Sequence, residues 1–167
     1  MDHPILRRAR DGDRAEILAI VNAAAEAYRG VIPADRWHEP YMAAAELEAE
    51  IAAGVGFWVH EALDGTLLGA MGFQPVQDVV LIRHAYVRPA RQGAGVGRAL
   101  LERLRAETDG QMLVGTWAAA EWAIRFYRRN GFADVGPERT AALLRRYWDI
   151  PERQIATSVV LASPPLA

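Results

Sequence analysis

The chain contains no cysteine among its 167 residues. Disulfide bonds, metal sites with thiolate ligands and a cysteine acyl-enzyme are therefore excluded. The sequence also lacks an excess of positive charge, since the formal net charge is −2 and the pI is about 6.1. Proteins that coat nucleic acids or bind anionic membranes need such an excess. We therefore expect neither nucleic acid nor membrane as a partner.

No apolar stretch approaches the length of a membrane-spanning helix, and the N-terminus has no cationic segment followed by an apolar run. Internal repeats, linkers and low-complexity tracts are absent as well. With 51% hydrophobic and 24% charged residues, the composition suits one domain with a buried core. We expect a single domain over residues 1–167 and a cytoplasmic protein.

The spacing of apolar residues predicts alternating helices and strands. Asp13 followed by Glu16 is typical of a capping box at the start of the first helix, and Asp64-Gly65 predicts a hairpin turn. Residues 79–87 are apolar on both faces, which favours a central strand. Strands are expected over residues 5–8, 57–63, 66–74, 79–87, 112–116 and 155–161, and helices over 13–28, 41–53, 95–108 and 119–129, with a short helix within 136–151.

Three glycines, Gly93, Gly95 and Gly97, occupy alternate positions where the predicted central strand runs into an amphipathic helix. Glycine lets the backbone come close to a ligand, and the N–H groups at a helix start point outward with the positive end of the helix dipole behind them. A turn alone would need one glycine rather than three. The pattern therefore predicts a cradle for an anion.

The spacing of the glycines decides which anion-binding motif fits. A dinucleotide-binding G-x-G-x-x-G counted from Gly93 would need a glycine at Arg98, and a phosphate loop would need lysine and a hydroxyl residue after Gly97. These mismatches disfavour a nicotinamide-binding oxidoreductase, which stays as an alternative function class, and the P-loop motif does not fit. Residues 92–97, Gln-Gly-Ala-Gly-Val-Gly, resemble instead the Q/R-x-x-G-x-G/A motif with which GNAT N-acetyltransferases bind the pyrophosphate of acyl-CoA.

A second motif of that family follows in the expected order. Residues 124–132 end in Phe-Tyr-x-x-x-Gly-Phe, where the tyrosine is Tyr127. The resemblance covers residues 79–135 in detail and the whole chain in layout. It implies the α/β (α+β) GNAT fold, with a mixed, largely antiparallel central sheet that is splayed at its middle and has helices on both faces. It also implies acetyl-CoA as the acyl donor without a metal cofactor, and it is compatible with a homodimer.

The resemblance assigns roles to residues around the cradle. The backbone N–H of Val87 matches the position that polarises the thioester carbonyl. Tyr127 is expected to act as the general acid, because a phenol stays protonated at neutral pH and can protonate the departing thiolate. The alternative for Tyr127 is a purely structural core residue. The expected coenzyme-binding residues are Tyr86, Val87, Arg88, Arg91, Gln92, Gly93, Ala94, Gly95, Val96, Gly97, Arg98 and Tyr127.

Several groups compete for the role of the base that takes the proton of the incoming amine. His84 is our candidate, because it is predicted to share a face of the central strand with Ile82 and Tyr86, and imidazole titrates near neutral pH. Some family members have a glutamate near residue 82, and the isoleucine here cannot take that role. The alternatives are a structural role for His84, His60 or Glu26 as the base, or a chain of waters.

A further departure from the family pattern lies seven residues before the tyrosine. The family commonly has an asparagine there that contacts the coenzyme, whereas this chain has Ala120. The loss of one hydrogen bond, worth about 1 kcal/mol, is expected to weaken coenzyme binding severalfold without abolishing it.

Two irregular segments, residues 28–41 and 136–153, frame the acyl end of the coenzyme in this fold. They contain aromatic residues and arginines, and Tyr28, Trp37 and Tyr147 are the expected substrate-binding residues. This composition suits a small amine that bears a carboxylate, such as an amino acid or an antibiotic-like amine. The expected reaction is acetyl transfer from acetyl-CoA to a primary amine by direct attack in a ternary complex. The alternatives are a protein N-terminal or lysine acetyltransferase and a non-catalytic acyl-CoA-binding sensor.

Overall fold

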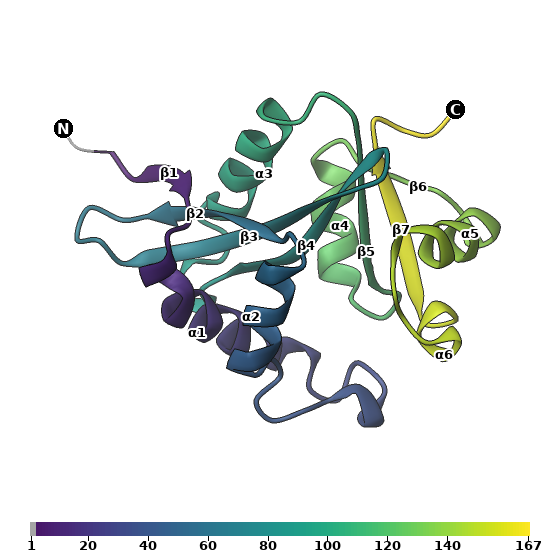
Figure 1. Ribbon diagram of the computed structural model, residues 1–167, viewed down its shortest axis with the longest axis horizontal. Helices are drawn as coiled ribbons and strands as arrows, with labels where there is room; N and C mark the ends of the chain where they lie inside the picture. The colour runs from purple at the N-terminus through teal and green to yellow at the C-terminus, as the bar shows by residue number, and fades with distance from the viewer. Residues whose placement is uncertain (1–2) are drawn as a thin grey trace.

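The computed structural model describes residues 3–167 and contains a seven-stranded, mostly antiparallel sheet with the strand order β1-β2-β3-β4-β5-β7-β6 (Figure 1). The expected fold class is confirmed. Within the described residues, no helix has both the length and the apolar character that crossing a membrane requires. The strands are β1 (Ile5–Arg8), β2 (Gly56–Glu61), β3 (Leu67–Val76), β4 (Val79–Val87), β5 (Gln111–Trp117), β6 (Ala133–Asp134) and β7 (Ser158–Ser163). The helices are α1 (Arg14–Ala25), α2 (Ala44–Ala52), α3 (Val96–Ala106), α4 (Glu121–Arg129), α5 (Pro137–Tyr147) and α6 (Glu152–Ile155).

The sheet opens between β4 and β5, its one parallel pair among the described strands. These strands are paired only from Val79↔Gln111 to Ile82↔Val114. Beyond that point β4 stays paired with β3 and β5 with β7, so the two strands diverge (Figure 1). The backbone groups on the facing edges of β4 and β5 are left without strand partners there. The predicted splay at the middle of the sheet is confirmed.

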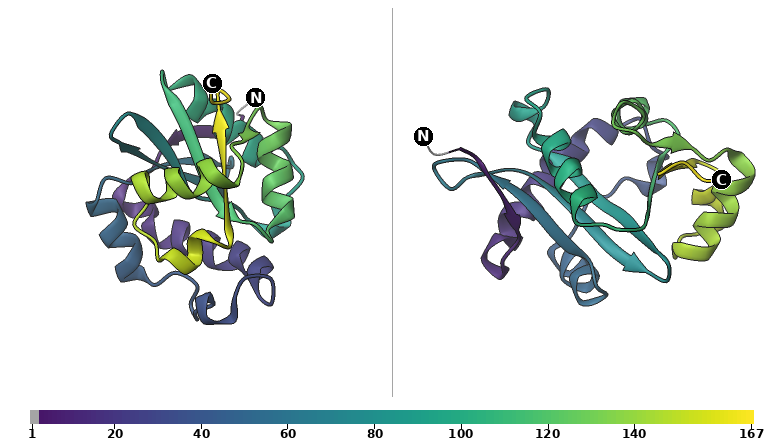
Figure 2. Two further views of the ribbon diagram at one scale, coloured as in Figure 1. Left: turned by 90° about the vertical axis from the view of Figure 1, so that its right-hand side faces the viewer. Right: turned by 90° about the horizontal axis from the view of Figure 1, so that it is seen from above.

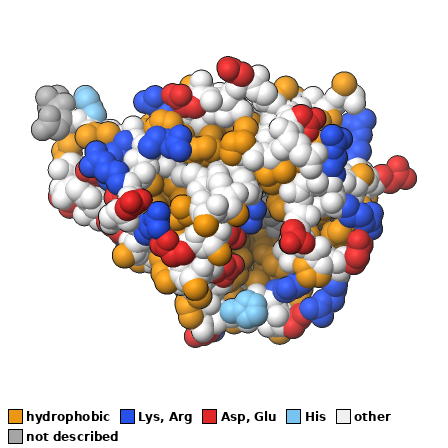
Figure 3. Space-filling model, viewed as in Figure 1, with side chains coloured by type: hydrophobic (Ala, Val, Ile, Leu, Met, Phe, Trp, Pro, Cys, Tyr) orange, Lys and Arg blue, Asp and Glu red, His pale blue; other side chains and the backbone are white. Residues whose placement is uncertain are grey.

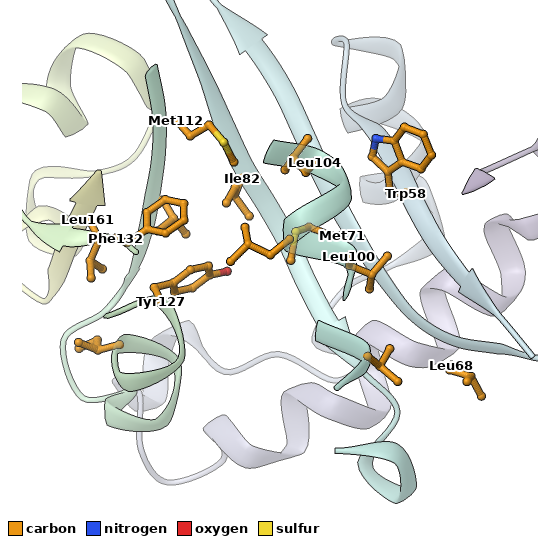
Figure 4. Packing of buried hydrophobic residues seen from close by; sticks show 14 residues of the cluster. Trp58, Leu68, Met71, Ile82, Leu100, Leu104, Met112, Tyr127, Phe132 and Leu161 are labelled. Carbon is orange, nitrogen blue, oxygen red and sulfur yellow. The ribbon is translucent and has the colours of Figure 1, made fainter. Parts of the chain in front are cut away.

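Helices cover both faces of the sheet. In Figure 1, α3 lies above the sheet and α1 and α2 lie below it. A first apolar cluster joins α3 and α4 to β3, β4 and β5, and includes Met71, Ile82, Leu100 and Tyr127 (Figure 4). A second cluster lies under α1 and α2. A third joins α5 to β5 and β7, and the left view of Figure 2 shows α5 and α6 beside β7.

The first helix begins differently from the expectation. Asp13 ends a short 3₁₀ turn before α1 and makes no capping hydrogen bond to that helix, so the capping box is wrong. Its carboxylate accepts hydrogen bonds from the Arg7 guanidinium at 2.7 and 3.0 Å. The Glu16 carboxylate accepts one from the Leu67 backbone N–H at 2.7 Å. Both acids therefore attach the helix to the sheet, because partners on the strands lie within reach of their side chains.

Other elements also differ from the predicted ones. Helix α2 begins at Ala44 rather than near residue 41, because the Asn22 amide holds the backbone N–H and C=O of Met42 outside the helix at 2.8 and 3.0 Å. Strand β7 begins at Ser158, after the additional helix α6. Strand β6 was not predicted, since two residues are too few to show a periodic pattern.

We expect Gly72→Ala to destabilise the fold strongly. A Cβ atom at residue 72 would lie 2.3 Å from the carbonyl oxygen of Arg83 on β4 and 3.0 Å from a ring carbon of Phe57. A backbone oxygen cannot move aside easily, so the free energy of unfolding should fall by about 3 kcal/mol. Urea denaturation measures this loss. Gly110→Ala is the control, because a Cβ there meets nothing within 4 Å; equal stability of both variants would contradict the prediction.

Candidate active site

The glycine cradle is a left-handed turn at the start of α3. Gly93 and Gly95 have φ angles of +79° and +84°, and a Cβ added to either would meet no atom within 4 Å. Gly97 has an ordinary φ, and a Cβ there would lie 3.3 Å from the Phe126 ring of α4. The first two glycines therefore shape an open turn, whereas the third allows α4 to pack closely against α3.

Several backbone N–H groups of this turn are available to a ligand. Those of Gly93, Gly95, Val96 and Gly97 donate to no carbonyl or side-chain oxygen of residues 3–167. The first N–H groups of a helix carry the positive end of its dipole, which stabilises an anion. Such a row of donors fits the two charges of a diphosphate, as the sequence predicts.

A cavity of about 1070 Å³, hereafter the first cavity, runs from this cradle to Tyr127. Of the expected coenzyme-binding residues, ten line it: Tyr86, Val87, Arg91, Gln92, Gly93, Gly95, Val96, Gly97, Arg98 and Tyr127. Ala94 and Arg88 do not. The Arg88 guanidinium instead binds the Glu16 carboxylate of α1 at 2.7 Å, so its charge links the end of β4 to that helix.

Tyr127 belongs to the core and also faces the first cavity. Its side chain belongs to the apolar core, with 5% of its surface exposed, and its ring packs edge-on against Phe126 and Phe132. It also lines the first cavity, and Figure 4 shows its hydroxyl end extending from α4 toward Ile82 of β4. Burial and, to a smaller extent, the neighbouring Tyr28 raise the pKa of the phenol. The phenol of Tyr127 therefore stays protonated at neutral pH.

The backbone of Val87 faces the gap between β4 and β5. The Arg88 N–H donates to the Leu68 carbonyl of β3 at 2.9 Å. Because successive N–H groups of a strand point to opposite edges, the Val87 N–H points away from β3. The Gln92 side-chain amide of the cradle donates a hydrogen bond to the Val87 carbonyl, with 3.4 Å between Nε2 and the oxygen. The N–H of Val87 is thus available next to the first cavity.

A bulge interrupts β4 at His84. The ladder with β3 pairs Gly72 with Arg83 and Ala70 with Tyr86, so two residues of β4 lie opposite Met71. His84 has a φ of +51°, in the left-handed region that non-glycine residues seldom occupy. An extra residue in one strand shifts the alternation of side chains beyond it.

The bulge corrects the predicted orientation of His84. Ile82 packs in the cluster under α3 and α4, whereas Tyr86 packs against the cluster under α1 and α2. His84 bonds through Nε2 to the Glu50 carboxylate of α2. His84 therefore lies on the α1 and α2 side with Tyr86 and not on the face of Ile82, because the simple alternation assumed from the sequence ends at Arg83.

A second cavity, of about 180 Å³, adjoins the first, with Tyr28 and Tyr86 lining both. Figure 3 shows a hollow lined by hydrophobic side chains on this face, between α2 and α6. Burial raises the pKa of Tyr28 to about 12 and also raises the pKa values of Tyr41 and Tyr86. The second cavity is lined by Tyr28, Tyr41, Ile82, Arg83, His84, Tyr86, Gly115, Thr116, Trp117, Leu144, Trp148, Ile150, Gln154 and Ser158.

Two expected substrate-binding residues lie outside both cavities. Trp37 stacks on Tyr41 with ring centroids 5.7 Å apart. The Tyr147 hydroxyl donates to the Asp78 carboxylate at 2.6 Å, near the start of β4 and away from the splay. The structure brings Tyr28 to the site but neither of these two. Trp148 lines the second cavity instead, and only its place in the irregular segment 136–153 pointed to it.

The weaker candidates for the base are also placed elsewhere. Burial lowers the pKa of His60, which lines neither cavity, and Glu26 binds Arg29 at 2.9 Å on the surface. Ala120, where the family has an asparagine, is fully buried just before α4 and lines neither cavity. Trp122, two residues later, lines the first cavity and stacks on Tyr28 with centroids 5.7 Å apart.

Comparisons with known proteins agree with the fold and the motifs. Residues 53–134 match the model of the acetyltransferase (GNAT) domain. Over 60 residues the chain is 37% identical to an IAA acetyltransferase of Azospirillum brasilense, a stretch that covers 34% of this chain and 39% of that protein.

Solved structures share the fold over nearly the whole chain. The PaiA N-acetyltransferase of Thermoplasma acidophilum, in complex with coenzyme A, has a TM-score of 0.70 at 16% identity and covers 96% of this chain and 98% of its own. YncA of Salmonella typhimurium, with its cofactor acetyl-CoA, has a TM-score of 0.65 at 24% identity, covering 96% and 93%. Residues 53–134 thus match the GNAT acetyltransferase domain, and the two motifs and the splayed sheet of this chain agree with that match.

Proposed function

We propose that the protein is an N-acetyltransferase that moves an acetyl group from acetyl-CoA to a small primary amine by direct attack in a ternary complex. The observation that carries this proposal is the meeting of two cavities at Tyr28 and Tyr86. The first contains the anion cradle and the buried phenol of Tyr127, and the second contains the imidazole of His84. Donor and acceptor can thus approach from different sides of the gap between β4 and β5.

The residues of the first cavity fit a coenzyme A thioester. The open turn at Gly93 and Gly95 leaves room for phosphate oxygens next to unpaired N–H groups. When bound, acetyl-CoA supplies an activated acetyl group as a thioester. The Val87 N–H stabilises the negative charge that develops on the thioester oxygen, an effect worth roughly 3 kcal/mol per donor. Tyr127 protonates the departing sulfur, and His84 takes a proton from the amine.

The second cavity favours an acceptor with a flat apolar body and no carboxylate. Three tyrosines and two tryptophans line it, and its volume is about 180 Å³. The arginines that suggested a carboxylate site in the sequence are paired on the surface. Arg145 binds Glu152, Arg153 binds Asp35 and Arg29 binds Glu26. Arg83 lines the cavity, but its guanidinium is paired with Glu50 at 3.3 Å and with Gln74 at 3.0 Å. A carboxylate in this cavity would therefore lose its hydration without gaining an unpaired cation.

A matched pair of amines tests the proposal. We expect 2-phenylethylamine to be acetylated with a kcat/KM at least about tenfold higher than phenylalanine, which differs by one carboxylate; about 1.4 kcal/mol of unpaired charge is enough for that ratio. Release of the thiol of coenzyme A measures the rate, and the chain contributes no thiol of its own because it has no cysteine.

Self-acetylation on a side chain does not complicate this assay, since all 19 cationic residues are arginines. A lysine-containing peptide in the same panel tests the protein acetyltransferase alternative. Preference for phenylalanine would support a carboxylate site and contradict our assignment of the acceptor. Saturable heat with acetyl-CoA but no thiol release with any amine would favour the sensor and overturn the proposed activity.

A further inference from the structure

Glu50 is the acidic residue of α2 that turns toward the sheet. The neighbouring acids of the helix, Glu46 and Glu48, are exposed, whereas the Glu50 side chain is only 19% exposed. Its carboxylate bonds to His84 Nε2 and lies 3.3 Å from the Arg83 guanidinium. Burial by itself would raise the pKa of Glu50, but the hydrogen bond from His84 and the charge of Arg83 hold it below its ordinary value. Glu50 is therefore ionised at neutral pH.

The contact with Glu50 fixes the state of the imidazole. An ionised carboxylate can only accept a hydrogen bond, so neutral His84 must carry its proton on Nε2. Its Nδ1 then has a free lone pair. The side chain of His84 is 16% exposed and lines the second cavity. The ring is thus held from one side by α2 while it faces the cavity in which the proposed acceptor binds.

The backbone at His84 is strained in a way that supports a functional role. A left-handed conformation costs a residue other than glycine free energy, and such positions persist where the surroundings enforce them, often at active sites. Here the bulge of β4 enforces it and turns the ring from the face of Ile82 to that of Glu50. Without the bulge, the histidine and the carboxylate would lie on opposite faces of the sheet.

The other ionisable groups that face this ring are poor proton acceptors at neutral pH. Tyr28 and Tyr41 approach from the segment after α1, and Tyr86 and Arg83 from β4. The raised pKa values of the three phenols keep them protonated, and a guanidinium is always charged. Strands β5 and β7 contribute Thr116 and Ser158, which do not titrate. Among the described residues that line the second cavity, the imidazole is the group suited to accept a proton.

We propose that Glu50 is a positioning residue that holds His84 as the general base of the acetyl transfer, an inference that rests on the proposed function. The ammonium of the acceptor gives a proton to Nδ1, and the imidazolium formed is stabilised by the Glu50 carboxylate. The amine lone pair then forms the C–N bond while the C–S bond breaks, and the sulfur takes the proton of Tyr127. The nitrogen of the new amide gives its second proton to the Tyr127 phenolate, and the imidazolium releases the first proton to solvent. One proton is therefore released per turnover, and both side chains return to their starting states.

Glu50→Gln tests the role of the carboxylate by kinetics. We expect kcat with 2-phenylethylamine to fall about tenfold, with the KM for acetyl-CoA unchanged. His84→Asn should lower kcat at least as far, because it removes the proposed base itself, and asparagine tolerates the left-handed backbone. Glu48→Gln, the same change on an exposed position of α2, is the control and should match wild type in both kcat and KM.

Histidine-labelled NMR gives a second readout that needs no substrate. The resonance that disappears in His84→Asn identifies His84 among the four histidines. In wild type its nitrogen shifts should report the tautomer protonated on Nε2, and in Glu50→Gln a mixture of both tautomers. An Nδ1-protonated ring in wild type, or unchanged shifts in Glu50→Gln, would overturn the inference.

The two proposals fail in different ways. If wild type releases no thiol with any amine, the proposed activity fails, whether or not Glu50 holds His84 in the tautomer protonated on Nε2. If wild type is active and Glu50→Gln keeps its rate, then Glu50 has only a structural role. Urea denaturation of Glu50→Gln shows whether a loss of rate merely follows a loss of fold. A lower kcat in a destabilised variant whose His84 nitrogen shifts are unchanged would count against the positioning role.

Discussion

Gly95→Asp is expected to abolish the binding of coenzyme A. Gly95 precedes the first residue of α3, and the space into which its side chain would grow is open. A carboxylate there would fill the cradle and place a negative charge where we expect a diphosphate. Titration calorimetry with coenzyme A should show affinity weakened more than about 100-fold, equivalent to about 2.7 kcal/mol.

Gly65→Asp is the matched control for this change. Gly65 also has a positive φ, +86°, and equally open surroundings, but it lies in the hairpin between β2 and β3. Any strain of a left-handed aspartate is thus shared by both variants, whereas only Gly95→Asp alters the cradle. If Gly95→Asp bound coenzyme A with the same saturable heat and affinity as Gly65→Asp, the phosphates would have to bind elsewhere.

Tyr127→Phe is expected to lower kcat by about 100-fold and to leave the Kd for coenzyme A within about twofold of wild type. The change removes the proton donor but keeps the ring that packs against Phe126 and Phe132. General acids typically contribute about 10²–10⁴-fold to a rate. Because the effect should appear in the chemical step alone, kcat and kcat/KM should fall together.

Tyr147→Phe provides the control for the loss of a tyrosine hydroxyl. Tyr147 is also mostly buried, and its hydroxyl bonds to Asp78 outside both cavities. We expect its kcat to match wild type, while its stability falls by about 1 kcal/mol for the lost hydrogen bond. If Tyr127→Phe had the same kcat as Tyr147→Phe, the Tyr127 side chain would have only a structural role in the core.

Local patterns predicted the parts of the site that are continuous in sequence. Residues 79–87 form the predicted strand β4 within its expected bounds, and the glycines of residues 93–97 form a turn at the start of a helix. Such segments depend on backbone conformation and on apolar periodicity, which neighbouring residues largely determine. The splayed sheet followed from the family resemblance and not from periodicity, since strand pairing is set by distant residues.

These local patterns did not predict the orientation of single side chains. Arg88 and Glu16 pair with each other although they are 72 residues apart, and Asp13 pairs with Arg7 of β1 instead of capping α1, so their local spacing misled the prediction. Tyr147 belongs to a segment expected at the site, but its hydroxyl donates a hydrogen bond to Asp78, which lies outside both cavities. A charged or hydroxyl group takes whichever partner the packing of helices on strands places within reach.

The family resemblance, the glycine turn and the position of the phenol at residue 127 could be predicted from sequence, because each depends on residues within one short segment. The face that His84 occupies could be seen only in the folded chain. The bulge opposite Met71 reverses the alternation of β4, and the packing of α2 against the sheet places Glu50 beside the imidazole. Residues 50 and 84 lie on separate elements, so no pattern within either segment encodes their contact.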